Sequence, residues 1–231
     1  MLEKLKHEVL KANLDLIKYR LVVLTWGNVS GIAREKELVV IKPSGIDYEK
    51  LTIDDMVVVD LIGKVVEGTR RPSSDTPTHI ELYKAFKEIG GITHTHSNYA
   101  TMFAQACKEI PCLGTTHADH FYGPIPLTRF LTKDEVEEAY ELNTGMVIIE
   151  RFQKLNPSST PGVLVAGHAP FAFGKSASDS VRNALILERV AEMALGTFQI
   201  DPDIKVLPEY VSEKHYQRKH GPNAYYGQKK L

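Results

Sequence analysis

The sequence predicts a mixed α/β fold, in which a largely antiparallel sheet is covered by helices on both faces. Short apolar segments of strand length alternate with segments of helical period, and the early strands follow one another with few helical crossovers. The 231 residues are ordinary for one α/β domain with a sizeable core, so we expect a single domain spanning 1–231. A doubly wound nucleotide-binding fold is the less favoured alternative.

The first third of the chain predicts one helix followed by two strands. Apolar residues at steps of three and four place one face of an N-terminal helix in the core. They are Leu2, Leu5, Val9, Ala12 and Leu16. The β-branched segments Leu38–Ile41 and Met56–Val59 are each followed by Gly or Pro, which is typical of buried strands.

The middle of the chain contains a helix bounded by clear signals and a strand rich in histidine. Pro77 suits the first turn of a helix reaching to about Ile89, and Gly90-Gly91 ends it before a strand at 92–96. This strand carries His94 and His96 on one face, because residues two apart on a strand point the same way.

The last third predicts two helices with a strand between them. Thr132 and Glu135 form a capping box that opens the first helix. The second is expected to begin at Ser178 and to end at Gly196. Between the two helices, Val163–Val165 is a strand that leads into His168.

Composition excludes several classes of partner. The net charge of −1 comes from 28 Lys and Arg against 29 Asp and Glu, so the chain shows no charge signature of a nucleic-acid or membrane partner. The charged residues among 1–6 and the absence of a long apolar run predict a cytoplasmic protein. Cys107 and Cys112 are too few for a disulfide framework, and we expect two buried, reduced thiols.

Four residues form the strongest chemical pattern. His94, His96, His168 and Asp75 all lie at the ends of predicted elements, where sites are commonly built. Three neutral imidazoles and one carboxylate suit Zn²⁺ with one position open to a substrate oxygen. His-x-His alone is also consistent with two hydrogen-bonded histidines that bind no metal. The six other histidines lack such pairing and are expected to be non-ligands.

A second pattern consists of small polar residues that could hold a phosphate. These are Gly27, Asn28, Ser44, Gly45, Ser73 and Ser74, with Lys42 beside the middle pair. Hydroxyls, exposed backbone N–H groups and one Lys would bind an anion without a long-range basic field. Each pair, taken alone, is equally consistent with an ordinary turn or a helix cap. The sequence contains no Walker-type or Gly-x-Gly-x-x-Gly loop, so a nucleotide cofactor has no support.

Long motifs in a fixed order resemble the class II aldolase and adducin head-domain family, and within it the bacterial L-ribulose-5-phosphate 4-epimerases. The motifs are TWGNVS at 25–30, KPSG at 42–45, PSSDTPTH at 72–79, GITHTH at 91–96, GTTHAD at 114–119 and YYGQ at 225–228. The resemblance implies a three-layer αβα sandwich, a homotetramer with active sites at subunit interfaces, and a small sugar phosphate as substrate.

The resemblance also implies a role for each matching residue. His94, His96, His168 and Asp75 match the metal site, and the six small polar residues match the phosphate pocket, with Lys42 assisting. Asp119 and Tyr226 match the two acid/base residues, and the segment of about 208–228 is expected to complete the active site. Further substrate-binding positions are Thr115, Glu141, His215 and Arg218.

The implied reaction inverts C4 of L-ribulose 5-phosphate to give D-xylulose 5-phosphate. The hydrogen on C4 is not acidic, so the reaction is expected to break and re-form the C3–C4 bond with Lewis-acid help from the metal. Two alternatives remain: an aldolase of a ketose 1-phosphate, which carries Glu where Asp75 stands, and a non-catalytic adducin-like module, which lacks the metal histidines. His120 and Phe173 depart from the family pattern, and the pathway served, L-arabinose or L-ascorbate-type degradation, stays open.

Overall fold

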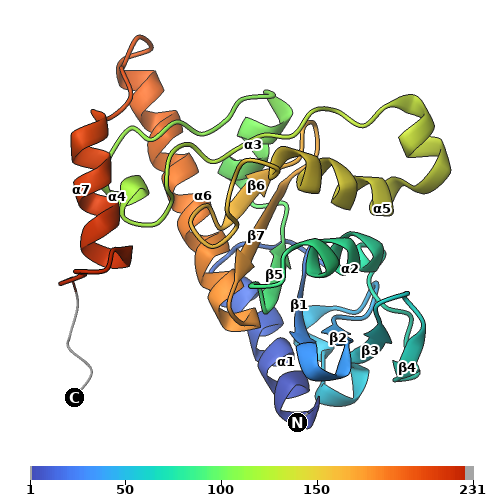
Figure 1. Cartoon of the computed structure of the whole chain (residues 1–231). Helices are drawn as coiled ribbons and strands as arrows, with labels where there is room; N and C mark the ends of the chain where they lie inside the picture. Colours follow the sequence, from blue (N-terminus) through green and yellow to red (C-terminus); the bar gives the residue numbers. More distant parts are fainter. Residues whose placement is uncertain (1, 227–231) are drawn as a thin grey trace.

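A computed structural model describes residues 2–226 and shows a mixed α/β fold built on one seven-stranded sheet (Figure 1). The strand order is β4-β3-β2-β1-β5-β7-β6, and every neighbouring pair is antiparallel, so the predicted fold class is confirmed. The strands are β1 (Asn28–Ala33), β2 (Leu38–Ile41), β3 (Val57–Asp60), β4 (Val65–Glu67), β5 (Gly91–His94), β6 (Gly162–Leu164) and β7 (Pro170–Gly174).

Helices cover both faces of this sheet. They are α1 (Leu2–Lys18), α2 (Thr76–Ala85), α3 (Asn98–Gln105), α4 (Thr115–Ala118), α5 (Lys133–Arg151), α6 (Ala177–Ile200) and α7 (Glu209–His220). Short 3₁₀ turns occupy Arg34–Lys36, Tyr48–Lys50 and Ile53–Asp55.

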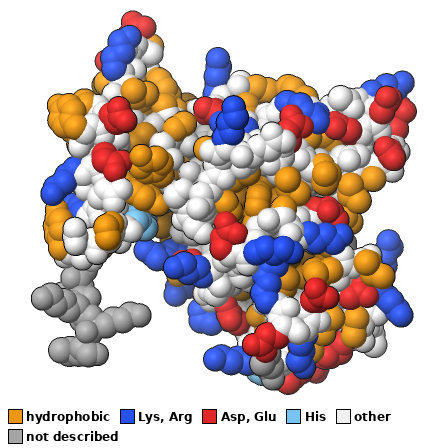
Figure 2. All heavy atoms as spheres, viewed as in Figure 1, with side chains coloured by type: hydrophobic (Ala, Val, Ile, Leu, Met, Phe, Trp, Pro, Cys, Tyr) orange, Lys and Arg blue, Asp and Glu red, His pale blue; other side chains and the backbone are white. Residues whose placement is uncertain are grey.

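Charges of both signs are distributed over the surface. On the face drawn in Figure 2, basic and acidic side chains are interspersed with apolar ones, in keeping with the net charge of −1. Among residues 2–226, no helix combines the length and the apolar character needed to cross a bilayer.

The alternation of side chains along the strands sorts the core into two layers. Val39 of β2 packs in a cluster with residues of α2 and α5, whereas its neighbour Val40 packs in a cluster with residues of α1 and α6. Successive strand residues point to opposite faces, so an all-apolar strand must be covered on both sides. A third cluster, between α3 and α6, extends the core beyond β6.

Several predicted boundaries are corrected by the structure. The last long helix begins at Ala177 after the Ser176 cap and runs through Gly196 to Ile200, because glycine inside a helix is unfavourable but tolerated. The helix at Pro77 ends at Ala85 rather than near Ile89. Arg34 explains this end, since its guanidinium donates to the carbonyl oxygens of Tyr83, Phe86 and Ile89 and so replaces further helical turns.

Other sequence predictions have mixed outcomes. The capping box is confirmed, with Thr132 Oγ1 accepting from Glu135 N at 3.2 Å and Thr132 N donating to the Glu135 carboxylate at 2.7 Å. Cys112 is buried, but Cys107 is only half-buried because it lies in the turn that follows α3, with φ of 53°. Both thiols are free.

The start of β5 is too crowded for any side chain, which makes Gly91 a sensitive position. A Cβ on Gly91 would collide with backbone atoms of Ser176 and Ala177, at the beginning of α6. We expect Gly91→Ala to lower the free energy of unfolding by about 3 kcal/mol, as overpacking against an immobile backbone does. Urea unfolding at one protein concentration measures this change.

Gly196→Ala is the matched comparison. Gly196 lies inside α6, and outside its own helical backbone no atom lies within 4 Å of the place that a Cβ would take. Ala should therefore raise the free energy of unfolding by about 0.5–1 kcal/mol. The two substitutions add the same methyl group and are expected to act with opposite signs. Equal unfolding midpoints for the two variants would contradict the packing described for β5 and α6.

Candidate active site

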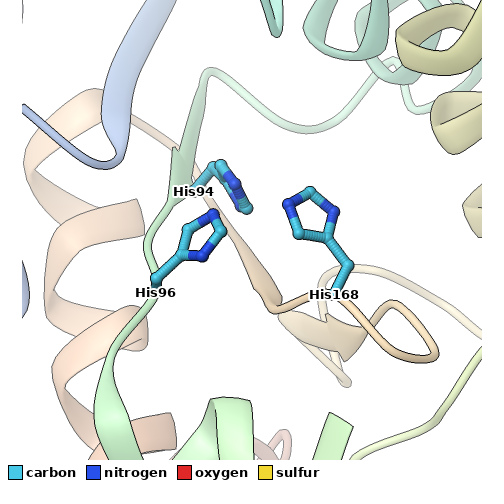
Figure 3. Close-up of side chains that lie close together, drawn as sticks. All are labelled: His94, His96 and His168. Atoms are coloured by element: carbon cyan, nitrogen blue, oxygen red, sulfur yellow. The ribbon is translucent and has the colours of Figure 1, made fainter. Parts of the chain in front are cut away.

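Three histidine side chains converge at one end of the sheet (Figure 3). His94 is the last residue of β5, His96 follows it on the way to α3, and His168 lies in the connection between β6 and β7. Their potential ligand atoms all lie within 4.8 Å of one another, and the ring centroids are 4.9 to 5.0 Å apart. Three imidazole nitrogens this close together are a donor set that suits one divalent cation.

A hydrogen bond orients the ring of His94, and burial disfavours the protonated form of His168. His94 Nδ1 donates to the carbonyl oxygen of Pro170 at 3.0 Å, which leaves Nε2 with a free lone pair, and the ring stacks on Phe171. Burial, together with repulsion from His94 and His96, lowers the pKa of His168 to about 4. His168 Nδ1 is also buried without a hydrogen-bond partner among the described residues. The donor set therefore fits a divalent cation.

Asp75 lies in the same pocket but is not part of the three-nitrogen cluster. It occupies the N-cap position of α2 without making a side-chain capping bond, and its Oδ2 accepts from Asn28 Nδ2 at 2.6 Å. Burial acts to raise the pKa of Asp75, but attraction from His94 and His79 and the Asn28 hydrogen bond outweigh burial and lower that pKa. The carboxylate is thus held ionised near the histidines.

One pocket of about 500 Å³ joins the histidine cluster to the small polar residues. It is lined by Thr25, Trp26, Gly27, Asn28, Lys42, Pro43, Ser44, Gly45, Ser73, Ser74, Asp75, His94, His96 and His168. The loops meet because Ser44 N donates to the carbonyl of Arg71 and Ser73 N donates to the carbonyl of Lys42. Thus the structure brings together every predicted metal-site residue and all seven residues predicted for the phosphate.

The side chain of Asn28 does not offer a donor to a phosphate in this arrangement. Its Nδ2 donates to Ser73 Oγ at 3.0 Å as well as to Asp75, which uses both protons. Asn28 therefore links the polar loop to the carboxylate beside the histidines. The side-chain donors that remain near Lys42 include its own ammonium and the hydroxyls of Ser44, Ser73 and Ser74.

Lys42 is an unusually buried cation at the wall of this pocket. Its residue is 2% exposed, and within the described chain its Nζ donates only to the Pro43 carbonyl, at 3.3 Å. The Nζ also lies 4.7 Å from the centroid of the Tyr48 ring. Desolvation lowers the pKa of Lys42. A buried charge with so few partners is available to pair with an anion entering the pocket.

Lys42→Met should therefore weaken substrate binding without harming the fold. Loss of a charge-assisted contact to phosphate, worth about 1.5–3 kcal/mol, is expected to raise KM about 10- to 100-fold with a smaller change in kcat. Steady-state kinetics, with inorganic phosphate as competitor, measure this effect. The free energy of unfolding should stay equal or rise, because a poorly paired buried charge is removed. A parental KM would exclude Lys42 from phosphate binding.

A second polar cluster lies at the contact between α4 and α7. Arg218 donates two hydrogen bonds to the Asp119 carboxylate, at 3.0 and 2.7 Å, and His215 Nδ1 lies 3.0 Å from Asp119 Oδ1. Lys219 adds an ion pair at 3.4 Å. Burial acts to raise the pKa of Asp119, but these partners outweigh burial and lower that pKa. The cations of Arg218 and Lys219 also lie over the ring of Tyr226, at 4.8 and 4.4 Å from its centroid.

This α4–α7 cluster does not share the histidine pocket. Among the described residues, the lining of the 500 Å³ pocket includes none from α4 or α7. Figure 1 shows these two helices together beside α6, at the opposite side of the molecule from α5. Within one chain, the structure therefore separates the predicted proton carriers Asp119 and Tyr226 from the predicted metal site.

The remaining predicted positions lie outside the pocket. Thr115 is exposed in the first turn of α4, and Glu141 lies in α5, where its carbonyl accepts from Thr78 Oγ1. His120 is beside Lys219, and burial and that cation lower its pKa to about 4. Phe173 packs in the core against Phe86 and Phe152, so this departure does not touch the site. Gly227 and Gln228 of the terminal motif lie outside the described residues.

Sequence reasoning missed three features of the site. Trp26 lines the pocket, although the sequence indicates it only as part of a longer motif. Tyr48 holds the backbone of the pocket in place, because its hydroxyl donates to the Gly27 carbonyl at 2.8 Å. Lys219 joins both Asp119 and Tyr226. The adjacency of Lys219 to Arg218 was the available signal for the last of these.

The sequence signature of the class II aldolase and adducin N-terminal domain matches residues 7–195, well over half of the chain. The chain belongs to the class II aldolase and adducin family. L-ribulose-5-phosphate 4-epimerases UlaF of Salmonella paratyphi A and Salmonella typhi are each 57% identical to it over 228 residues, covering 99% of this chain and 100% of theirs. This family membership confirms the resemblance seen in the motifs.

Solved structures of the family have the same fold. An L-fuculose 1-phosphate aldolase superimposes with a TM-score of 0.78 at 27% identity, covering 93% of this chain and 95% of that one. The L-fuculose 1-phosphate aldolase from Glaciozyma antarctica PI12 gives a TM-score of 0.76 at 18% identity, covering 94% and 81%, and so supports the fold alone. Members of this family typically use a divalent metal, in keeping with the three-histidine cluster.

Proposed function

We propose that this chain is an L-ribulose-5-phosphate 4-epimerase, which interconverts L-ribulose 5-phosphate and D-xylulose 5-phosphate. The observation that carries the proposal is one pocket lined by three clustered imidazoles, a buried lysine and a group of hydroxyls. Such a pocket suits a substrate with oxygens for a metal at one end and a phosphate at the other. The 57% identity to named epimerases over nearly the whole chain supports this substrate.

His94, His96 and His168 would hold the cation, which we propose to be Zn²⁺. When bound, a divalent cation supplies Lewis-acid stabilisation of the negative charge that develops on the substrate. Asp75 is proposed as a further ligand and is kept ionised and oriented by Asn28. Lys42, Ser44 and Ser74 would hold the phosphate with the backbone at Gly27, Gly45 and Ser73, and so fix one end of the substrate while the other reacts.

Asp119 and Tyr226 are proposed to move the proton of the C4 hydroxyl. The C3–C4 bond breaks when this hydroxyl loses its proton. It re-forms after the aldehyde has turned its other face to C3, and the C4 oxygen then regains a proton. His215 and Arg218 orient Asp119 through their hydrogen bonds, and Thr115 and Glu141 are proposed to contact the substrate at the margin of the site.

Because α4 and α7 lie outside the histidine pocket, we propose that a neighbouring subunit brings its α4–α7 cluster to this pocket. A closed homotetramer would repeat this contact at each site, with the segment of about 208–228 completing the neighbour's site. We also propose that residues 1–231 form a single domain. The free thiols Cys107 and Cys112 suit the reducing cytoplasm, which we propose as the compartment.

The test is a coupled assay with two substrates. L-ribulose 5-phosphate should be converted to D-xylulose 5-phosphate, whereas L-fuculose 1-phosphate should yield no dihydroxyacetone phosphate at a comparable rate. Metal-depleted protein should lose the first activity and regain it when Zn²⁺ is restored. Preferred cleavage of the ketose 1-phosphate would favour the aldolase instead, and inactivity toward both sugars in metal-loaded protein would refute the proposal.

A further inference from the structure

Trp26 lines the pocket next to one of its three histidines. Its indole is 6.3 Å from the ring of His96, measured between centroids, and it lines the same pocket as Lys42 and Ser44. The residue is 53% exposed, so a large apolar ring forms part of the mouth of a pocket that is otherwise mainly polar. It is also the single tryptophan of the chain.

The backbone around Trp26 is held in place from several sides. Trp26 N donates to the Val23 carbonyl at 3.1 Å and closes a tight turn in which Leu24 has a φ of 53°, a strained value for a branched side chain. Gly27 follows with a φ of 89°, where a Cβ would lie 2.7 Å from the His94 carbonyl oxygen. The Tyr48 hydroxyl contacts the carbonyls of both Trp26 and Gly27. The indole is therefore placed by its backbone rather than by burial of its side chain.

We infer that Trp26 retains the two-carbon fragment during turnover and so determines that the enzyme epimerises rather than cleaves. This inference rests on the proposed function. An epimerase of this kind must hold glycolaldehyde phosphate while the aldehyde rotates and re-adds, whereas an aldolase lets it leave. The half-exposed indole lines the pocket beside His96, so it is placed to obstruct a fragment that leaves the pocket. A rigid aromatic wall does this at little cost in side-chain entropy.

Cleavage and re-addition need no reactant besides the substrate and a base of the protein. The C4 hydroxyl gives its proton to a protein base, its O–H electrons form the aldehyde C=O, and the C3–C4 bonding pair moves into the enediolate of C1–C3. Re-addition to the other aldehyde face returns the pair to a C3–C4 bond and the proton to the C4 oxygen. If the fragment escapes, the enediolate instead takes a proton at C3 and leaves as dihydroxyacetone, beside glycolaldehyde phosphate.

The experiment compares metal-loaded Trp26→Ala and Trp26→Phe with the parent on L-ribulose 5-phosphate. Trp26→Ala should raise the ratio of dihydroxyacetone to D-xylulose 5-phosphate on the order of tenfold or more, because it removes a large aromatic contact. Trp26→Phe, which keeps a ring, should raise the ratio far less. Ile62→Ala removes an exposed apolar side chain outside the pocket and should leave the ratio unchanged.

Trp26 also reports on its own surroundings, because all tryptophan emission of the protein comes from it. Glycolaldehyde phosphate should shift the parent's emission to shorter wavelength as it covers the indole, and inorganic phosphate should shift it less. A purely structural tryptophan would respond to neither ligand.

The outcomes separate this inference from the proposed function. If the parent makes D-xylulose 5-phosphate but Trp26→Ala releases no more dihydroxyacetone than the parent, the retention role alone is wrong. If the parent converts no L-ribulose 5-phosphate, both ideas fail. Size-exclusion chromatography gives the remaining check, since leakage accompanied by dissociation of the assembly would assign Trp26 to a subunit contact and overturn the retention role.

Discussion

Replacing His94 and His96 together by Asn is expected to remove the bound divalent metal and to lower kcat about 10³-fold or more. Two of three imidazoles are lost from a cluster whose ligand atoms lie within 4.8 Å of one another. One remaining histidine with a nearby carboxylate cannot provide the three or four ligands that hold Zn²⁺ firmly. Elemental analysis after dialysis, together with the epimerase assay, measures both effects.

Two comparison variants show whether the loss is specific. His7→Asn removes an exposed histidine of α1, and Cys107→Ala removes a half-buried thiol after α3. Neither residue lines the pocket, so both variants should keep parental metal content and activity. Equal metal content in the double histidine variant and the parent would rule out the proposed metal site.

Tyr226→Phe is expected to lower kcat roughly 10²-fold or more while metal content stays at the parental level. The substitution removes only the phenolic hydroxyl. The ring can still interact with the cations of Arg218 and Lys219, which lie 4.8 and 4.4 Å from its centroid, so residue 226 should keep its position. Parental activity in this variant would exclude Tyr226 as a proton carrier.

Mixing Tyr226→Phe chains with the double histidine variant tests whether the site is shared between subunits. After subunit exchange, some contacts would pair an intact histidine pocket of one chain with an intact Tyr226 of another. Activity should then exceed that of either variant alone. If a mass measurement demonstrates subunit exchange and no activity returns, the shared architecture is wrong.

The fold class and the residues of the pocket could be predicted from the sequence more accurately than the residues at which helices and strands begin and end. The strands at Leu38–Ile41 and 56–59 were found because both their faces are buried, as Val39 and Val40 show, but the equally buried β7 was not predicted. β1 was missed because its core is interrupted by Ser30 and Gly31, and Ser30 is buried only through hydrogen bonds to His79 and Tyr83. Local propensity does not reveal such a tertiary network.

The site shows a similar division between local pattern and tertiary contact. The spacing of His94 and His96 is a local pattern, although β5 ends at His94 and not at residue 96 as predicted, whereas the pairing of distant loops brings Lys42 and Ser73 into the same pocket. The use of both Asn28 amide protons by Ser73 and Asp75 follows from packing of β1 against the α2 start, which no spacing predicts. The α4–α7 cluster was predicted only through the family resemblance, since 99 residues separate Arg218 from Asp119.

The most direct test of the central claim is proton NMR of the epimerase reaction carried out in D₂O with metal-loaded protein. Breaking and re-forming the C3–C4 bond leaves the hydrogen on C4 in place throughout. The account therefore predicts that L-ribulose 5-phosphate becomes D-xylulose 5-phosphate with full retention of hydrogen at C4. Deuterium at C4 of the product would show that inversion occurs by proton abstraction, and this result would contradict the account.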